Sequence, residues 1–269
     1  MKIGFIGCGN MATAMINGIL QSGMCQRQDL AASAKSEATR SKIKNELHIY
    51  AAASNQEVVE FADIVFLAVK PQYYDQVIAQ VRDAVKDGQI YVSIAPGKSL
   101  QQLEDFFGRS VKLVRAMPNT PAMVGEGMTA YCVNEQVTLE EKEQVVGILE
   151  SFGKAEEVEE SMMHAVVSVS GSSPAYVFLF LEAMADAAVA DGMPRTQAYT
   201  FAAQAVLGSA KMVLETGMHP GVLKDMVCSP GGTTIEAVRV LEEKGMRSSV
   251  IEAMRACAKK AGKVGTIQE

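Results

Sequence analysis

The segment Met1–Ala12, MKIGFIGCGNMA, decides the fold of the first half of this chain. Its apolar run Ile3–Ile6 leads into a glycine turn that fits G-x-G-x-x-G/A, and a helix-forming stretch follows. In a dinucleotide-binding turn the first glycine makes the tight bend, the second lets the backbone approach a pyrophosphate, and the last small residue packs helix on strand. The helix start then points free N–H groups at the phosphates. The predicted contacts are Gly7, Gly9, Asn10, Met11 and Ala12.

The composition is that of a globular enzyme, and the length of 269 residues suits roughly two domains. The net charge of −6 gives no electrostatic case for binding nucleic acid or an anionic membrane. We expect no signal peptide, and no membrane span because polar or charged residues interrupt the apolar stretches. The five cysteines form no CxxC pair and no Cys/His cluster, which predicts reduced thiols in a cytoplasm and no metal site.

Residues 1–160 alternate short β-rich runs with helical stretches, a pattern typical of a parallel sheet covered on both faces. The predicted strands are Ile3–Ile6, Leu30–Ser33, Ile49–Ala51, Ile64–Val69, Ile90–Ile94, Val111–Ala116, Thr129–Val133 and Ala155–Val158. We therefore predict an α/β fold whose N-terminal domain, residues 1–160, is a Rossmann-type, doubly wound, mostly parallel sheet.

Residues 161–269 are predicted to form a second, all-helical domain. The predicted helices are Ser161–Val169, Pro174–Ala190, Arg195–Glu215, Pro220–Met226, Thr233–Glu243 and Arg247–Ala261. Within them, Ala175–Met184 is apolar around most of the helix circumference, and such a helix must be buried. A chain of this size has little interior to bury it in, so burial between subunits is favoured over an intramolecular bundle.

The end of the second predicted strand bears on the choice of cofactor. NAD-preferring folds place an acidic residue there, but this chain has Ser33, Lys35 and Ser36 instead. Two hydroxyls and an ammonium suit a 2′-phosphate, which favours NADP and leaves NAD as the alternative. Arg40 lies one helical turn further on, and we interpret it as a solvated surface residue.

Ligands of open α/β sheets bind at the carboxyl ends of the strands, so the turns there are further candidates for the cofactor site. Asn55 lies in the turn after the third predicted strand, where it is expected to cap the next helix. The remaining candidates follow the fourth, fifth and sixth strands: Ala68, Val69, Lys70, Pro71, Ala95 and Asn119.

Two polar turns of the helical half are candidates for binding substrate. Ser170–Pro174 leads into the long apolar helix. Ser229–Thr234 opens the next-to-last predicted helix with two glycines and two threonines, which is more than a helix cap needs. Such a turn exposes consecutive backbone N–H groups at a positive helix end and suits a carboxylate.

In their order and spacing, five segments resemble the pyrroline-5-carboxylate reductase family over essentially the whole chain. They are MKIGFIGCGNMA, AVKPQ (68–72), RAMPNTPA (115–122), SGSSPAYVF (170–178) and VCSPGGTTIEAV (227–238). The resemblance implies an NAD(P)H-dependent reduction of 1-pyrroline-5-carboxylate to L-proline, the last step of proline biosynthesis. It also implies a helical domain that interlocks into homodimers, which can assemble further into decamers.

By this resemblance, a cyclic imine carboxylate is the substrate. Its carboxylate would bind at Ser229, Gly232 and Thr233, and the Thr234 hydroxyl would meet the imine nitrogen in the catalytic role. Ser172, Ser173 and Glu160 would border the same pocket. The turn Ala95-Pro96-Gly97-Lys98 departs from the Ala-Gly pair that relatives often show, which leaves the backbone near the nicotinamide open.

Two other functions remain as alternatives. A 3-hydroxy acid dehydrogenase shares the two-domain layout and commonly uses a lysine on a long helix, for which Lys211 and Lys224 are candidates. A non-catalytic dinucleotide-binding scaffold is the other. The turn Ser229–Thr234 has no role in either.

Overall fold

The computed structural model describes residues 1–264. They divide into two compact units, which are described separately: unit 1 comprises Met1–Ser172 and the chain from Cys257, and unit 2 comprises Ser173–Ala256. The predicted division after residue 160 stays a prediction, and the last five residues of the predicted second domain lie outside the described part.

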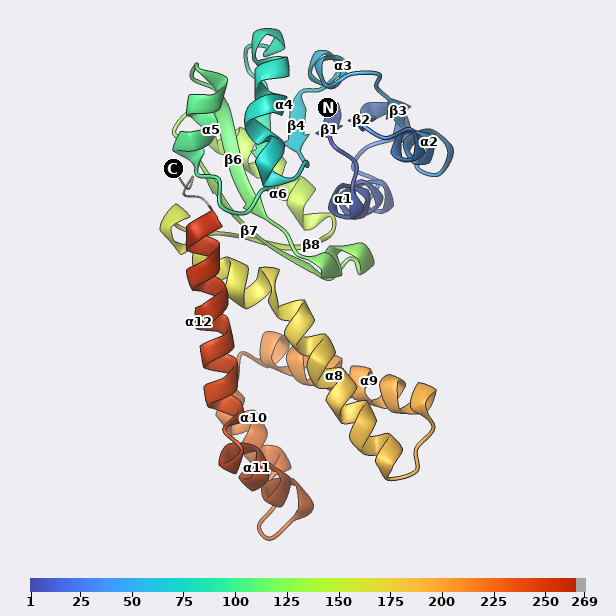
Figure 1. Ribbon diagram of the computed structural model, residues 1–269, viewed down its shortest axis with the longest axis vertical. Coiled ribbons are helices and arrows are strands. Elements are labelled where there is room, and N and C mark those ends of the chain that lie inside the picture. The colour runs from blue at the N-terminus through green and yellow to red at the C-terminus, as the bar shows by residue number, and fades with distance from the viewer. Residues whose placement is uncertain (265–269) are drawn as a thin grey trace. The chain divides into compact units, whose positions relative to one another are not determined.

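Unit 1 is built on an eight-stranded sheet in the order β3-β2-β1-β4-β5-β6-β7-β8 (Figure 1). All neighbouring strands run parallel except β6 and β7, which are antiparallel. The strands are β1 Ile3–Ile6, β2 Leu30–Ser33, β3 Tyr50–Ala51, β4 Ile64–Leu67, β5 Ile90–Ser93, β6 Lys112–Met117, β7 Gly127–Val133 and β8 Gly153–Glu157. The chain order reverses beside β1, which gives the sheet the switch point where ligands bind in such folds.

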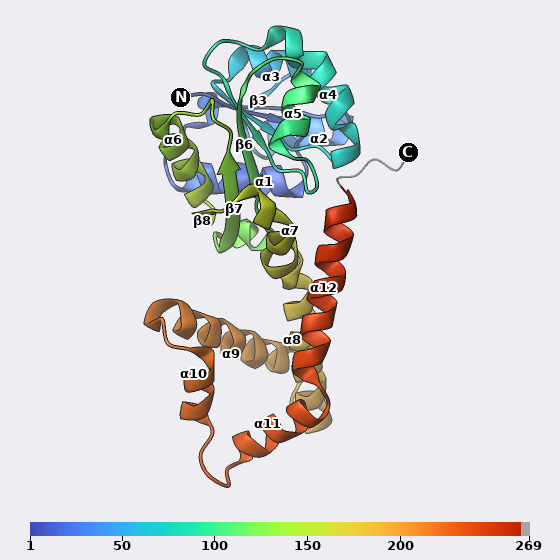
Figure 2. The same cartoon turned by 90° about the vertical axis from the view of Figure 1, so that its left-hand side faces the viewer.

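Helices cover both faces of the sheet because strand side chains alternate between two apolar clusters. Phe5 and Phe66 face a cluster shared with one set of helices, whereas Val65 and Leu67 face a cluster shared with the other set. The first set is α1 Asn10–Gln21, α2 Glu37–Asn45 and α6 Leu139–Glu150. The second set is α3 Asn55–Phe61, α4 Tyr74–Val81 and α5 Leu100–Phe107 (Figure 2). The predicted doubly wound, mostly parallel sheet is confirmed.

Two predicted elements differ most from the structure. Strand β4 ends at Leu67, so Ala68 and Val69 lie in a loop instead of the strand. The predicted helix Ser161–Val169 is a 3₁₀ turn, then α7 Met163–Val166, then a π-helical turn, Val167–Gly171. The hydroxyls of Ser168 and Ser170 donate to the carbonyls of Ala165 and Val166, and such back-bonding competes with regular helical geometry.

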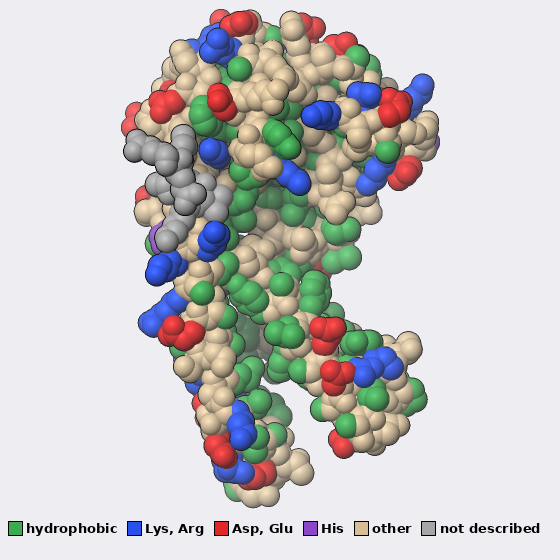
Figure 3. Space-filling model, viewed as in Figure 1, with side chains coloured by type: hydrophobic (Ala, Val, Ile, Leu, Met, Phe, Trp, Pro, Cys, Tyr) green, Lys and Arg blue, Asp and Glu red, His purple; other side chains and the backbone are tan. Residues whose placement is uncertain are grey.

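Unit 2 consists of helices, as predicted for this half of the chain. They are α8 Ser173–Ala190, α9 Arg195–Thr216, α10 Pro220–Val227, α11 Thr233–Glu243 and the first part of α12 Met246–Val264. Only Ala185, Ala198 and Ala202 are buried among the residues of unit 2. Large apolar side chains such as Phe178 and Leu179 are exposed instead, and Figure 3 shows hydrophobic side chains gathered on these helices. Three buried alanines are too little core to hold a helical domain together alone.

One helical run differs from the expectation of no membrane span. Within the described residues, Glu160–Ala190 is long and apolar enough to cross a membrane by length and composition, and little of it is buried. The core helix of a protein outside membranes passes the same test. The few interrupting polar residues on which the prediction rested do not break this helical run.

Candidate functional site

A cavity of about 960 Å³ opens in unit 1 where β1, β2 and β4 end. It is large enough for a dinucleotide, since ligand pockets commonly measure about 300–1,000 Å³. The predicted cofactor residues that line it are Gly7, Gly9, Ser33, Lys35, Asn55, Ala68, Val69 and Lys70. The structure thus brings together residues from four separate turns at one edge of the sheet, as the strand order requires.

The two glycines of the first turn show how the site fits a dinucleotide. Gly7 has φ of 94°, and a Cβ added there would lie 2.8 Å from the carbonyl oxygen of Ala68. A Cβ on Gly9 would meet no heavy atom of the described residues within 4 Å, and its φ of −82° suits any residue. The fold therefore requires glycine at Gly7, whereas the lack of a side chain at Gly9, an N-cap position, leaves room for a ligand in the cavity.

Helix α1 begins at this turn with backbone N–H groups available to an anion. Its N-cap is Gly9, and no side chain of the described residues caps the helix. The first N–H groups of a helix have no intrahelical partner, so an uncapped start beside a cavity suits a pyrophosphate.

Ser33 and Asn55 lie beside each other at the cavity wall. Ser33 is buried, and its hydroxyl donates to Asn55 Oδ1 at 2.6 Å, while Asn55 Nδ2 donates to Gln80 Oε1 at 2.8 Å. The predicted capping role of Asn55 is wrong, because Ser54 is the N-cap and its Oγ accepts from Glu57 N at 3.1 Å. Asn55 is the first helical residue, which frees its amide for the chain of bonds from Ser33 to Gln80.

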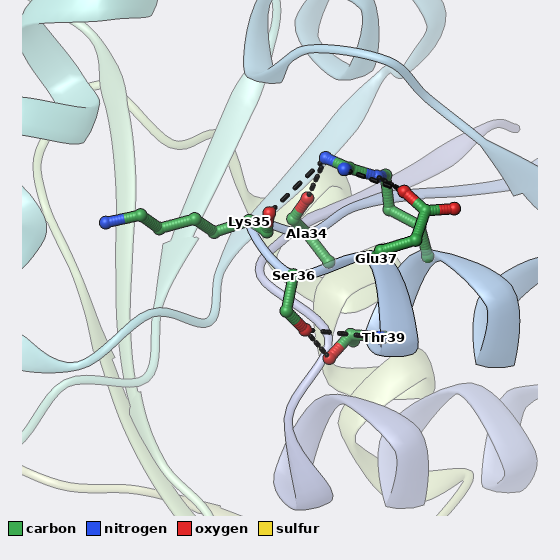
Figure 4. Close-up of polar contacts among 6 residues, drawn as sticks. Ala34, Lys35, Ser36, Glu37 and Thr39 are labelled. Carbon is green, nitrogen blue, oxygen red and sulfur yellow. Dashed lines mark hydrogen bonds and ion pairs between the residues drawn. The ribbon is translucent and has the colours of Figure 1, made fainter.

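The loop from β2 to α2 presents the cation of Lys35 and the hydroxyl of Ser36, and the first turn of α2 adds the hydroxyl of Thr39 (Figure 4). Ser36 caps α2: its Oγ accepts from Thr39 N at 3.2 Å and lies 2.8 Å from Thr39 Oγ1. The exposed Lys35 side chain extends away from Ser36, Glu37 and Thr39 (Figure 4). Lys35 lines the cavity and forms no ion pair with a carboxylate of the described residues.

Other predicted cofactor residues do not line the cavity: Asn10, Met11, Ala12, Pro71, Ala95 and Asn119. Ala12 and Ala95 are buried, and Pro71 starts a 3₁₀ turn. The Asn119 amide is engaged on both sides, since Nδ2 donates to Ser170 O at 3.0 Å and Oδ1 accepts from Met128 N at 2.8 Å. Asn119 thus joins the end of β6 to the start of β7 and to the π-helical turn.

Several residues that line the cavity were not predicted from the sequence: Cys8, Thr39, Ala53, Ser54, Tyr73, Gln76, Val77 and Gln80. Tyr73, Gln76 and Gln80 recur at helical spacing beside a predicted ligand turn, which is a signal that would have found them. Arg40, interpreted as a surface residue, also lies in the cavity wall.

The turn Ser229–Thr234 lies in unit 2 and begins α11. Gly231 has φ of 69°, and Gly232 N donates to Ser229 O at 3.0 Å. A Cβ on Gly232, the N-cap of α11, would lie 2.5 Å from Ser229 Oγ. The closed turn leaves the N–H groups of Thr233 and Thr234 in the first turn of the helix, as an anion site requires.

Of the other predicted substrate residues, Ser172 and Glu160 have partners within unit 1. Ser172 Oγ lies 3.3 Å from the Cys257 thiol. Glu160 Oε1 accepts from Arg115 Nη1 and from Leu100 N, both at 2.8 Å. Ser173 begins α8. The Arg115–Glu160 pair borders a separate cavity of about 260 Å³ that includes Gly97 of the divergent turn.

A cavity large enough for a dinucleotide at the switch point of a doubly wound sheet, in a chain whose other half is helical, is the layout of an NAD(P)-dependent oxidoreductase. Residues 160–264 match the family model described as pyrroline-5-carboxylate reductase dimerisation, and residues 2–97 match one described as NADP oxidoreductase, coenzyme F420-dependent. The chain belongs to the pyrroline-5-carboxylate reductase family.

Individual relatives agree over nearly the whole length. Pyrroline-5-carboxylate reductase of Escherichia coli K12 is 55% identical over 263 residues, which cover 98% of both chains. Among solved structures, pyrroline carboxylate reductase of Plasmodium falciparum with NADP bound has 32% identity and a TM-score of 0.91, covering 99% of this chain and 98% of that one. The enzyme from Coxiella burnetii matches with the same identity and TM-score, covering 99% of both chains.

The family decides between the alternatives left open by the sequence. It is a reductase family, so neither the 3-hydroxy acid dehydrogenase nor the non-catalytic scaffold describes this chain. Lys211 forms a 3.4 Å ion pair with Glu215, and Lys224 forms one of 2.5 Å with Asp225. Both candidate lysines of the dehydrogenase alternative therefore have carboxylate partners within unit 2.

Proposed function

We propose that this chain reduces 1-pyrroline-5-carboxylate to L-proline with NADPH held in the cavity of unit 1. The observation that carries the proposal is the 55% identity over 98% of the chain to a pyrroline-5-carboxylate reductase. The site geometry agrees with it, since each turn leads into the start of a helix, where the first N–H groups have no intrahelical partner.

Unit 1 binds and orients the cofactor. Gly7 shapes the turn, Gly9 leaves room for the pyrophosphate, and the start of α1 supplies N–H donors. When bound, a reduced nicotinamide dinucleotide supplies the hydride. At the other end of the cavity, Lys35 and the hydroxyl pair of Ser36 and Thr39 suit a 2′-phosphate, and an acidic residue that would bind the 2′-OH of NAD is missing from the cavity wall as described. We therefore infer a preference for NADPH over NADH.

Unit 2 supplies the substrate-binding turn. The substrate carboxylate binds at Ser229, Gly232 and Thr233, where Thr233 supplies a backbone N–H group, and Thr234 Oγ1 meets the imine nitrogen. A protonated cyclic imine accepts hydride readily, so the protein mainly orients the ring and excludes water, and it needs no covalent nucleophile. Ser172, Ser173 and Glu160 remain candidates for binding substrate.

Self-association follows from the dimerisation domain that the family model places at residues 160–264. We infer that homodimers bury the exposed apolar side chains of α8 and α9, and that dimers assemble further, up to a decamer. This burial also accounts for the apolar helical run Glu160–Ala190 without a membrane. All five cysteines are free, which supports a reducing compartment such as the cytoplasm.

Titration calorimetry with NADP⁺ and with NAD⁺ tests the cofactor assignment. We expect NADP⁺ to bind about tenfold more tightly or better, because a phosphate–lysine pair contributes roughly 1.5–3 kcal/mol. Equal dissociation constants for the two cofactors would remove the 2′-phosphate site from the proposal and leave the reductase assignment in place.

A further inference from the structure

Arg40 is the most extensively bonded side chain of the cavity wall. Its Nη1 donates to the backbone carbonyls of Ala34 at 3.2 Å and Lys35 at 3.3 Å. On its other side, Nε and Nη2 donate to Glu37 Oε2 at 3.1 and 2.9 Å (Figure 4). These four bonds use all three nitrogen atoms of the guanidinium, so Arg40 is not simply solvated.

The helix directs Arg40 toward the loop. Side chains of an α-helix lean toward its N-terminus, so Arg40, in the first turns of α2, reaches back over Glu37 to the chain that precedes Ser36. The guanidinium then ties two successive carbonyls of the loop to the first turn of the helix. Its positive charge is already balanced by a carboxylate and two carbonyl dipoles.

Lys35 has the opposite arrangement. Its backbone carbonyl is held by Arg40, while its side chain is exposed and extends away from Glu37 (Figure 4). Fixing a backbone carbonyl fixes the peptide plane beside it and thereby the direction in which the side chain leaves. Arg40 and Lys35 therefore differ in role: the Arg40 side chain is bound within the protein, and the Lys35 side chain remains available for a ligand.

We propose that Arg40 is a positioning residue for cofactor selectivity: it holds the backbone of Ala34 and Lys35 so that Lys35 meets the 2′-phosphate, and it does not bind the phosphate itself. This inference rests on the proposed function, namely on NADPH in the cavity with Lys35 at its 2′-phosphate. It makes a specific chemical demand on the side chain at position 40. Both sides of the planar fork are needed, so a lysine, which carries the same charge on a single nitrogen, cannot replace it.

The test measures KM and kcat with NADPH and with NADH at saturating pyrroline-5-carboxylate. The variants are Lys35→Met, Arg40→Met, Arg40→Lys and the double variant Lys35→Met/Arg40→Met. Arg82→Met is the matched control, because Arg82 is an exposed arginine of unit 1 that does not line the cavity and pairs with Asp83 only at 4.0 Å. Circular dichroism establishes that each variant is folded.

We expect Lys35→Met to raise the KM for NADPH about tenfold, the equivalent of one lost charge-assisted contact, and to leave the KM for NADH within about twofold. Both Arg40 variants should lose most of the same selectivity with kcat retained. The double variant should be little worse than Lys35→Met, because residues that act through one contact are not additive. The Arg82 control should match the wild type.

Three results would overturn the inference. Wild-type selectivity in Arg40→Lys would mean that charge alone suffices, and multiplied effects in the double variant would mean that Arg40 contacts the phosphate independently. Unchanged selectivity in Arg40→Met would mean that Arg40 has no part in cofactor selectivity. If Lys35→Met itself left the ratio of the two KM values unchanged, the proposed 2′-phosphate site at Lys35 would be wrong. This result differs from one in which Lys35→Met loses selectivity and the Arg40 variants do not, which would contradict only the role of Arg40.

Discussion

Gly7 and Gly9 lie two residues apart in one turn, yet the structure gives them different reasons for being glycine. Only Gly7 has a left-handed backbone, with φ of 94°, and its Cβ position is blocked at 2.8 Å by the Ala68 carbonyl. Gly9 has an ordinary backbone and open space in front of it. A substitution of Gly7 should therefore lower mainly the stability of the fold, and a substitution of Gly9 should weaken mainly cofactor binding.

Alanine substitution tests this separation. Gly7→Ala should lower the free energy of unfolding by about 1–3 kcal/mol, the usual cost of a strained backbone and a close contact. Gly9→Ala should cost less than about 1 kcal/mol, as at an ordinary N-cap, but should raise the dissociation constant for NADP⁺ at least about tenfold. Denaturant unfolding without cofactor and titration calorimetry measure the two effects. Equal losses of stability would contradict the account.

Thr234 carries the second residue-scale prediction. Thr234→Ala should lower kcat/KM for pyrroline-5-carboxylate by about 10- to 100-fold without abolishing turnover, because a neutral alcohol orients the imine nitrogen but is a poor acid. Thr200→Ala is the matched control, since the Thr200 hydroxyl in the same unit donates to the Thr196 carbonyl at 3.1 Å. A complete loss of activity, or no loss of activity at all, would rule out an orienting role.

At the scale of single residues, the sequence predicts which residues lie at the site better than it predicts their hydrogen-bond partners. The fingerprint, Lys35 and Ser36 could be read from the sequence because each follows a strand end. The bond from Ser33 to Asn55 and the bonds of Arg40 could not, because they depend on which turns the strand order brings together and on how side chains lean along α2. Asn119 shows the same limit, since its two partners lie at Met128 and Ser170.

At the scale of elements, α6 and β6 are joined by one ion pair, between Glu141 and Lys112. Burial raises the pKa of the Glu141 carboxyl, but hydrogen bonds from Lys112 and Thr138 outweigh it and hold the pKa below its ordinary value of 4.5. The folded protein thus binds this proton less tightly than the unfolded chain. The stabilisation is present in full above pH 4.5 and is lost as the pH falls through the lower folded value.

Glu141→Gln should therefore lower the free energy of unfolding by about 1 kcal/mol at neutral pH, and the difference from the wild type should vanish at acid pH. Glutamine still completes the capping box with Thr138, so the change isolates the charge. The exposed Glu143→Gln on the same helix is the control. A difference that stayed constant from neutral to acid pH would contradict the assigned cause.

Elements themselves were largely predictable, because apolar runs and caps are local signals. Strands β1 and β2 begin and end where the sequence predicts, as does α11. The π-helical turn Val167–Gly171 was not predictable from periodicity, since a serine that bonds back to a carbonyl looks like any polar helix residue.

For the whole molecule, unit 2 requires a partner. Its buried residues are three alanines, while Phe178 and Leu179 on α8 are 61% and 68% exposed. The apolar circumference of Ala175–Met184 predicted this from sequence, because a helix that is apolar all round has no solvent face. The sequence could not say which helices cover it.

Phe178→Ser combined with Leu179→Ser should therefore shift the protein toward single chains in sedimentation velocity, with loss of activity at low protein concentration. Lost burial of two large apolar side chains costs about 3–6 kcal/mol per subunit. Glu182→Gln, an exposed change on the same helix, is the control. A wild-type protein that sediments as a single chain at micromolar concentration would contradict the assembly proposed here.

The most direct test of the central claim is a steady-state assay with pyrroline-5-carboxylate and each reduced cofactor, in which proline is measured alongside cofactor oxidation. We predict one proline formed for each NADPH oxidised, and a higher kcat/KM for NADPH than for NADH. Cofactor oxidation without proline, or no oxidation in the presence of this imine, would contradict the account.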